Sequence, residues 1–390
     1  MPPPSPLSWT ELCAKHFYGK AISPTFREAS NTDADAWDAW DARDARDARD
    51  ARDARDADAR DASSDVRAFL SFVTSHQSTF IPASAHAEIN AWAIHRVVGK
   101  LGPPGFRMCY LCAPGEEARV GKLVTTVLAP SAARATLLLR EATGRSHESV
   151  DIVFVATTLP RLLPDQTRGA VGPEHINGGV TFFRYSPPRV LVWREEDAEK
   201  VIVHELVHRF GIDEALRLNT PFELAAEARL AAFYGVHTTG VQLGANEAYT
   251  EALACVLYVH LSCARTRANA GANAGANAGS GADGALMVAS QHFAELASRL
   301  ATHFGLSPEH PFAYTESTHA FAYVACRAAL FQPAHLERLL LDHPPRSPPT
   351  DMEAFVLRLS VALDDLRHSL ATRGPGRSSA SRRLSAVAWS

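Results

Sequence analysis

Hydrophobic residues recur along the chain in two patterns, one typical of helices and one typical of strands. Spacings of three and four residues predict helices at residues 69–73 and 89–97. Unbroken runs of apolar and β-branched residues instead favour strands at residues 123–128 and 151–156, and the second run is typical of a buried strand. The first half of the chain is therefore predicted to mix helices and strands.

A predicted β-hairpin leads into a helix in the middle of the chain. Residues 176–184 and 189–193 are two strand-like runs, and residues 185–188 between them have the composition of a turn. The acidic residues 195–197 suit the positive end of a helix dipole, and Gly211 suits the left-handed position that ends a helix. We therefore expect a helix between them.

Helical spacing dominates the second half of the chain. Apolar stripes end before Gly235 and Gly305, and Thr350 with Glu353 forms a capping box that opens a further helix. The predicted helices cover residues 222–234, 246–260, 293–304, 321–331 and 350–370. This order of elements predicts an α+β fold with a small mixed sheet, followed by a mostly helical C-terminal part.

Three stretches hold too few apolar residues to pack against a core. Residues 33–61 are almost wholly Asp, Ala and Arg, and their three-residue repeat sets like charges at i,i+3, so we expect a disordered or transiently helical segment. An Ala-Asn-Ala-Gly repeat and a final tail rich in Gly, Ser and Arg are the other two. The expected organisation is an N-terminal segment over 1–63, one domain over 64–372 with a low-complexity insertion at 264–284, and a flexible basic tail over 373–390.

Composition and charge exclude several classes of protein. The formal net charge is -4, which provides no footprint for nucleic acid, and no run of about 20 apolar residues is present to cross a membrane. The N-terminus lacks the features of a secretory signal, so we expect an intracellular, cytoplasmic setting. The six cysteines suit a reducing compartment, and the lone CxxC of Cys109 and Cys112 is interpreted as ordinary half-buried thiols.

His204, Glu205 and His208 form an HExxH motif within the helix predicted before Gly211. Two histidines four residues apart project from one helical face, which is the geometry that two imidazoles need to bind one Zn²⁺. Glu205, one step round the helix, can then act as general base toward a zinc-bound water. Because a catalytic zinc has three protein ligands and one open position, a third ligand is expected downstream.

Two acidic residues match known ligand spacings but lack a supporting context. Glu214 lies six residues after His208, where the pattern HExxHxxGxxH has a histidine. Asp213 and Glu214 are more simply solvated residues that follow a helix. Glu227 lies 19 residues after His208, the spacing of one aminopeptidase group, but its helix favours a solvated position for it.

Glu247 has more support, because a second acid follows it on the same helical face. Glu247 and Glu251 are four residues apart, and the apolar residues that follow them place their helix in the core. Burying both acids would be costly unless they served a metal. Glu247 can then bind zinc, while Glu251 accepts a hydrogen bond from the far ring nitrogen of a zinc-bound histidine and fixes its tautomer.

The two motifs together resemble those of the thermolysin-like gluzincins, zinc peptidases in which an NExxxD segment follows HExxH. The resemblance implies that Glu247 is the third zinc ligand and that Glu251 supports a ligating histidine, with Glu in place of the family's Asp. A broader likeness, which adds residues 176–181 and 314–318, is to uncharacterised metallopeptidase-like proteins of giant DNA viruses of protists. These likenesses favour Glu247 over its rivals and imply a zincin-like fold, in which an edge strand lies beside the HExxH helix.

The sequence therefore predicts zinc-dependent hydrolysis of a peptide or protein substrate, which would bind along residues 178–183 by β-augmentation. Gluzincins usually add a His or Tyr that stabilises the oxyanion, and this position stays open among Tyr249, Tyr314, His310 and His319. The alternative is a catalytically inactive, zinc-stapled virion or host-interaction protein. Glu205 argues against the alternative, because a staple needs no base. An accidental HExxH is opposed by the second motif.

Overall fold

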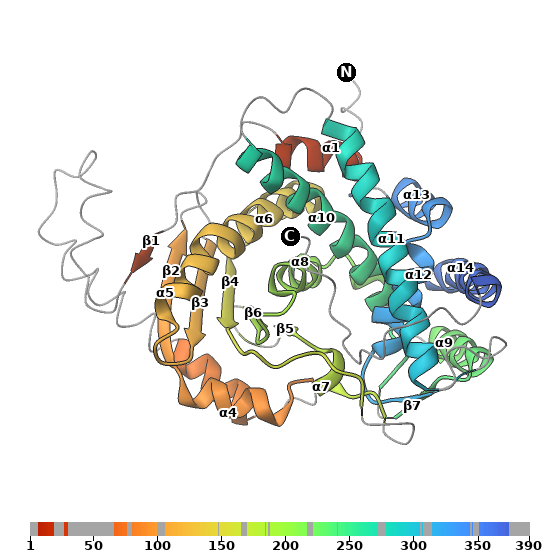
Figure 1. Ribbon diagram of the computed structural model, residues 1–390, viewed down its shortest axis with the longest axis horizontal. Coiled ribbons are helices and arrows are strands. Elements are labelled where there is room, and N and C mark those ends of the chain that lie inside the picture. The colour runs from red at the N-terminus through yellow and green to blue at the C-terminus, as the bar shows by residue number, and fades with distance from the viewer. Residues whose placement is uncertain are drawn as a thin grey trace, which may run out of the picture.

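A computed structural model describes most of the chain. The described residues are 7–18, 27–29, 66–75, 80–99, 106–146, 148–164, 170–183, 185, 188–216, 221–239, 241–270, 278–304, 306, 314–343, 345 and 351–373. The Asp-Ala-Arg repeat, residues 271–277 and the tail from residue 374 lie outside them. The described part is an α+β fold, with a mixed sheet on one side and a C-terminal helical region on the other (Figure 1).

One sheet of six strands, in the order β1-β2-β3-β4-β6-β5, supports the site. β3 pairs parallel with β4 and β4 pairs parallel with β6, whereas the other neighbours are antiparallel. β5 lies at the edge and forms the predicted hairpin with β6. The strands are β1 (Arg27–Ala29), β2 (Ala93–Gly99), β3 (Phe106–Cys112), β4 (Val150–Val155), β5 (Gly179–Phe182) and β6 (Arg189–Val192), and β7 (His237–Thr238) pairs with β8 (Thr315–Glu316) in a second, two-stranded sheet.

Helices cover the sheet and build most of the C-terminal region. α10 joins the two parts, because it packs against α8 on one side and against α11 and η5 on the other. The helices are α1 (Trp9–Cys13), η1 (Ala14–Tyr18), Val66–Ser75, α4 (Ala83–Ala91), α5 (Glu117–Leu123), η3 (Val124–Leu128), α6 (Ala129–Thr143), α7 (Pro173–Ile176), α8 (Ala198–Arg209), η4 (Glu214–Leu216), α9 (Pro221–Tyr234), α10 (Ala245–Ala270), α11 (Ala278–His303), η5 (Ala322–Cys326), α12 (Arg327–Leu330), α13 (Pro333–Asp342) and α14 (Met352–Arg373).

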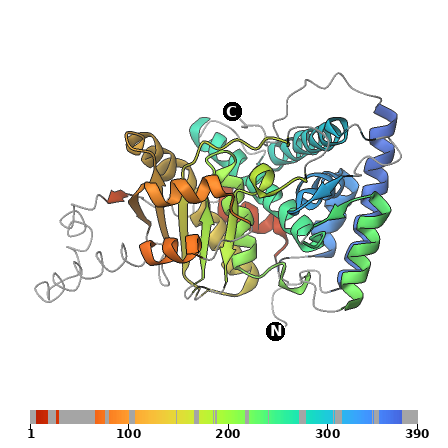
Figure 2. The same cartoon turned by 90° about the horizontal axis from the view of Figure 1, so that it is seen from below.

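Alternate residues of the strands face two different cores. Met108 and Cys112 of β3 belong to the large core with α6 and α8, whereas Cys109 belongs to a smaller core with α4 and the helix Val66–Ser75. These last two helices lie across the sheet in Figure 2. Because Cys109 and Cys112 project from opposite faces, the CxxC motif does not bring its two thiols together, and both are buried.

The run at residues 123–128 is helical, so the expected strand there was wrong. α5, η3 and α6 form one continuous helix over Glu117–Thr143, in which Val124 and Leu128 face the core. Alanine-rich helix-forming sequence on the C-terminal side outweighs the β preference of this short run. By length and composition this is the one described helix that could cross a membrane, but 56% of its most apolar window is buried inside the protein, as in a core helix.

Other differences concern where elements begin and end. Residues 92–97 were expected to be helical, but α4 ends at Ala91 and β2 follows, because pairing with β3 outweighs the helical spacing. Packed structure begins before residue 64, since Trp9 and Phe17 are buried in the large core. The expected insertion at 264–284 is helical over its described residues, as parts of α10 and α11.

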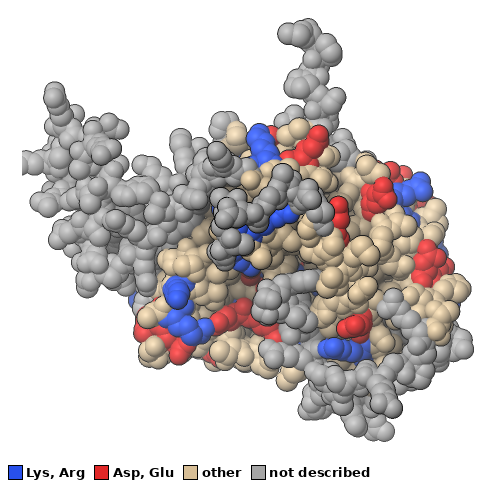
Figure 3. Space-filling model, turned by 45° about the horizontal axis from the view of Figure 1, so that its top comes forward, with Lys and Arg blue, Asp and Glu red and all other residues tan. Residues whose placement is uncertain are grey.

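Several predicted elements are confirmed. β4 coincides with the predicted buried strand, and the hairpin precedes α8 as expected. Gly211 and Gly235 adopt the left-handed conformation, with φ of 66° and 71°, after α8 and α9 respectively. On the face shown in Figure 3, acidic and basic side chains of the described residues are interspersed over the surface.

Candidate metal centre

α8 is buried over its whole length. It packs against β5 and β6 of the sheet, against α6 and against α10. His204, Glu205 and His208 are only 5%, 5% and 8% exposed. Polar side chains inside a protein need partners, so the motif residues must be satisfied by groups from neighbouring elements.

His204, His208 and Glu247 bring three ligand atoms together between α8 and α10. The Nε2 atoms of the two histidines are 3.0 Å apart. Glu247 Oε2 lies 3.3 Å from Nε2 of His204 and 3.2 Å from Nε2 of His208. Among the described residues this is the one group of His, Cys, Asp and Glu side chains whose spacing could hold a metal ion.

The separations within this group fit tetrahedral zinc. Zinc binds imidazole nitrogen and carboxylate oxygen at about 2.0–2.1 Å, so two ligands of a tetrahedral ion lie roughly 3.3–3.4 Å apart. The three observed separations, 3.0, 3.2 and 3.3 Å, are close to that value. Two imidazoles and one carboxylate are also a donor set that catalytic zinc sites use, with a fourth position for water or substrate.

A carboxylate behind each histidine sets the direction of its ring. Glu251 Oε2 lies 3.0 Å from Nδ1 of His204, and Asp213 Oδ2 lies 2.9 Å from Nδ1 of His208. An ionised carboxylate can only accept, so each Nδ1 donates to its carboxylate and each Nε2 is the ring nitrogen that faces Glu247. Metal-binding histidines are held in one tautomer by contacts of this kind.

Charge coupling in this buried group shifts pKa values in opposite directions. Burial disfavours the charged form of His208, but the carboxylates of Glu247 and Asp213 outweigh it and raise the pKa of His208 well above its usual value. Burial also acts to raise the pKa of Glu247, but His208 and His204 outweigh it and hold that pKa well below its usual value. The carboxylate of Glu247 is therefore ionised and ready to bind a cation.

Asp213 was expected to be solvated, and this was wrong, because its side chain is fully buried. The left-handed Gly211 turns the chain at the end of α8, so that Asp213 comes back to His208. A signal for this contact was present in the sequence, as an acid two residues after the glycine that ends the helix. Glu214 differs from its neighbour, since 64% of its side chain is exposed and it pairs with Arg145 at 3.2 Å.

Glu227 is buried as well, which also corrects the solvated position expected for it. Its two oxygens accept hydrogen bonds from the backbone N–H of Ala245 at 2.5 Å and of Gly244 at 3.3 Å. These donors lie at the N-terminus of α10, where N–H groups have no partner within the helix. Glu227 therefore caps the helix that carries Glu247.

Glu205 is held against the edge strand β5. Thr181 Oγ1 donates a hydrogen bond to Glu205 Oε2 at 2.8 Å. A Cβ atom on Gly179 would lie 2.8 Å from Cγ and 2.9 Å from Oε1 of Glu205, so a glycine is needed for this close approach. Burial raises the pKa of Glu205 above its ordinary value, which suits a carboxylate that must take up and release a proton.

A cavity of about 410 Å³ lies between β5 and this group, and we call it the cleft. Its wall includes Thr181 from the edge strand, Glu205 and Glu247 from the helices, and His319 and Tyr323 from the C-terminal region. Tyr323 was not among the sequence candidates, because no motif marks its position in η5. Its hydroxyl donates a hydrogen bond to Glu247 Oε2 at 3.0 Å.

The other candidates for stabilising an oxyanion are separated by the fold. His319 lines the cleft. Tyr249 packs edge-on against Phe355, and Tyr314 donates a hydrogen bond to Glu316 at 3.0 Å, and neither lines the cleft. His310 lies outside the described residues.

Comparisons with known proteins assign no family. A scan against models of protein families, a search of curated proteins and a search of solved structures each found no match. The finding that bears on function is the buried group of His204, His208 and Glu247, in which the two histidines have HxxxH spacing on one helix. This group is consistent with a zincin-like site and could hold a metal ion.

Proposed function

We propose that this chain is a zinc-dependent peptidase of the gluzincin type, with His204, His208 and Glu247 as the zinc ligands. The observation that carries the proposal is the position of Glu205, a buried carboxylate beside the two histidines in the wall of the cleft. A zinc site that only stabilises a fold uses four protein ligands and needs no base. The present group has three ligands, a base and room for a substrate.

In the proposed reaction, each residue has one task. Zinc bound by the three ligands would supply a Lewis acid that polarises a peptide carbonyl and acidifies water. Glu205 takes a proton from the attacking water and later passes it to the leaving amine. Thr181 holds the carboxylate of Glu205 in place during both transfers. The hydroxyl of Tyr323 can donate to the carbonyl oxygen as negative charge develops there.

We propose that the substrate is a peptide or protein that binds along β5. This strand lies at the edge of the sheet, and Val180 and Thr181 line the cleft. An edge strand offers unpaired backbone N–H and C=O groups, so an extended peptide can add to it as a further strand. A peptide in that position would run past Glu205.

Metal content is the first test. Protein purified without chelators should carry one equivalent of zinc, measured by elemental mass spectrometry. Glu247→Ala should lose it, while Glu214→Ala, which changes an exposed acid outside the group, should keep it. Wild-type protein without stoichiometric zinc would sink the proposal, and a Glu247→Ala variant with full zinc affinity would remove Glu247 from the ligand set.

Activity separates a peptidase from a protein that uses zinc only as a staple. Wild type and Glu205→Gln are compared on a mixed peptide library, with cleavage read by mass spectrometry. The proposal expects cleavage by the wild type and a loss of at least 100-fold in the variant, as is typical for general bases. If both proteins bind zinc and neither cleaves, or both cleave equally, the stapled alternative replaces the peptidase.

A further inference from the structure

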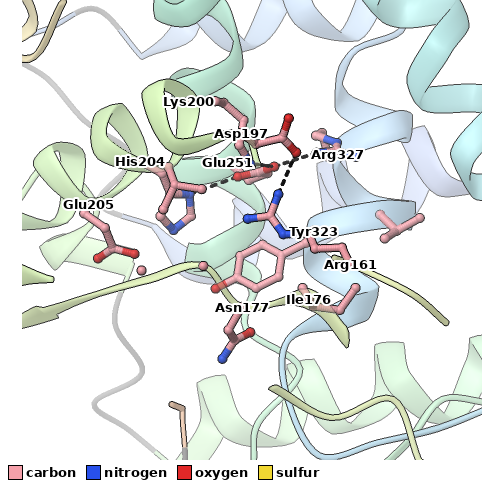
Figure 4. A pocket seen from close by; sticks show the side chains of 14 residues that line it. Arg161, Ile176, Asn177, Asp197, Lys200, His204, Glu205, Glu251, Tyr323 and Arg327 are labelled. Atoms are coloured by element: carbon pink, nitrogen blue, oxygen red, sulfur yellow. Dashed lines mark hydrogen bonds and ion pairs between the residues drawn. The ribbon is translucent and has the colours of Figure 1, made fainter. Parts of the chain in front are cut away.

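A second, smaller cavity lies beside the metal group and is lined by charged side chains. It measures about 50 Å³, and it shares Asn177, Gly179, Glu205 and Tyr323 with the cleft. That volume has room for roughly three or four waters, or for one carboxylate group and a water. We call it the charged pocket, after the side chains that gather there in Figure 4, namely Arg161, Asp197, Lys200, Glu251 and Arg327.

In the wall of the charged pocket three cations pair with two carboxylates, while the third carboxylate there, Glu205, accepts a hydrogen bond from the edge strand instead. Lys200 Nζ and Arg327 Nη1 both donate to the same atom, Glu251 Oε1, at 2.6 Å each. The other oxygen of Glu251 already accepts from His204. One carboxylate therefore serves two cations and a histidine, although Lys200 and Arg327 are both more than nine-tenths buried.

Arg161 is the third cation, and it comes from the loop that follows β4. Its Nη1 donates to Asp197 Oδ2 at 2.6 Å, and its side chain is only 8% exposed. Its Nε is buried without a hydrogen-bond partner among the described residues. A Cβ atom on Gly178 would clash with Arg161 Nη2, so the glycine leaves the guanidinium its place in the wall.

Asp197 adopts a backbone conformation that costs local stability, and its side chain holds Arg161 in the pocket wall. It is the one described residue other than glycine with a positive φ, at 60°. It stands at the N-cap of α8, where an aspartate usually caps the helix, yet its side chain makes no capping hydrogen bond. The left-handed backbone instead turns the carboxylate toward Arg161, as the dashed line in Figure 4 marks.

We propose that the charged pocket binds a carboxylate of the peptide substrate, so that the enzyme selects peptides with a carboxylate beside the scissile bond. This inference rests on the proposed peptidase function. Guanidinium groups bind carboxylates through paired N–H donors, and Arg161 and Arg327 each use only part of their five. Because Glu205 and Tyr323 line both cavities, a group in the charged pocket lies next to the reacting peptide bond.

Two sources of a carboxylate fit this chemistry, and the probes distinguish them. Fluorescein-labelled octapeptides are prepared with one Glu moved through each position and an amidated C-terminus, with Gln in place of Glu, and with Gln and a free C-terminal carboxylate. Their binding to zinc-loaded Glu205→Gln protein is measured by fluorescence anisotropy. A preference confined to Glu peptides indicates a side-chain pocket, and one confined to the free C-terminus indicates a terminal-carboxylate pocket.

The proposal expects at least one class of carboxylate peptide to bind about tenfold or more tightly than its neutral partner, since a charge-assisted hydrogen bond of ordinary strength has that effect. Arg161→Met should abolish most of this preference for carboxylate peptides, and Arg161→Lys should retain part of it. Arg338→Met, which changes an exposed arginine of α13, is the matched control and should leave the ratio unchanged.

Asp197→Asn distinguishes a loss of the pocket from a loss of folding. It should increase the preference for carboxylate peptides, which a misfolded protein could not do. Asparagine tolerates the left-handed backbone but leaves Arg161 without its carboxylate, so carboxylate peptides should bind more tightly. Equal binding of all peptides, or a ratio that neither Arg161→Met nor Asp197→Asn changes, overturns the proposal. Cleavage by the wild type without a carboxylate preference refutes the charged pocket alone, whereas a preference without any cleavage supports the pocket and refutes the peptidase.

Discussion

Oδ2 of Asp213 lies 2.9 Å from Nδ1 of His208, across the turn that ends α8. The other ring nitrogen of His208, Nε2, faces Glu247. A carboxylate in this position orients the imidazole and makes it a stronger ligand, because it stabilises the positive charge that the ring acquires on binding a metal.

Asp213→Asn should therefore weaken zinc binding by about tenfold, at the lower end of the effect of such partners. Zinc affinity is measured by competition with a chromophoric chelator. Glu214→Gln is the control, because it changes the next residue along the chain, which is exposed and pairs with Arg145. Equal zinc affinity of the two variants would contradict a role for Asp213.

Glu227→Gln should lower stability without changing zinc content. The variant replaces an acceptor of the Gly244 and Ala245 N–H groups by an amide that must turn one N–H donor toward them. The expected cost is about 1–2 kcal/mol in the free energy of unfolding, measured with urea. Glu337→Gln on α13, an exposed position, should cost nothing measurable. Loss of zinc at unchanged stability would instead make Glu227 a ligand.

Gly179→Ala should impair both folding and activity. The added methyl group would meet Val201 at 2.7 Å and Glu205 at 2.8 Å, so α8 and β5 must move apart. Overpacking of this kind typically costs about 1–3 kcal/mol, and it displaces the proposed base. Gly284→Ala on α11 has no atom within 4 Å of the new group and should be neutral or slightly stabilising. Thermal melting and peptide cleavage report the two effects, and a fully active Gly179→Ala enzyme would refute the predicted contact.

Stability should fall as pH rises, because of Glu316. Burial raises the pKa of this carboxyl to about 8 in the folded protein, against 4.5 as its ordinary value. Between these two pH values the folded state therefore binds more protons than the unfolded state. The contribution of Glu316 to the free energy of unfolding is fully present below pH 4.5 and is lost as pH rises toward 8. The loss is on the order of a few kcal/mol.

Glu316→Gln isolates this contribution, since glutamine resembles the protonated acid and does not titrate. The free energy of unfolding is measured with urea at pH 5 and at pH 8. It should differ less between the two pH values in the variant than in the wild type. Identical pH dependence of both proteins would mean that Glu316 is ionised in the folded state.

Much of the candidate metal centre could be predicted because its signals are local. The spacing of His204 and His208 needs only a helix, and Gly211 marks where that helix ends. The pairing of Glu247 with Glu251 needs only a second helix. The hairpin of β5 and β6 likewise follows from two apolar runs and a short turn between them.

The sequence predictions that were wrong also have a common cause. Residues 92–97 and 123–128 took the opposite secondary structure, because strand pairing and the continuation of a long helix outweighed short patterns. Asp213 and Glu227 looked like surface acids, since neither a buried hydrogen bond to His208 nor the N–H groups that open α10 can be seen from a residue's own neighbours in the chain.

The sequence by itself determined the chemistry of the candidate site, namely two imidazoles, a base and nearby acids. Only the tertiary structure decided which acids reach the histidines, and that Tyr323 and Arg161 join them from distant segments. The physical reason is that such contacts depend on how α8 packs against α10 and β5. That packing is set by the whole core, and no local spacing encodes it.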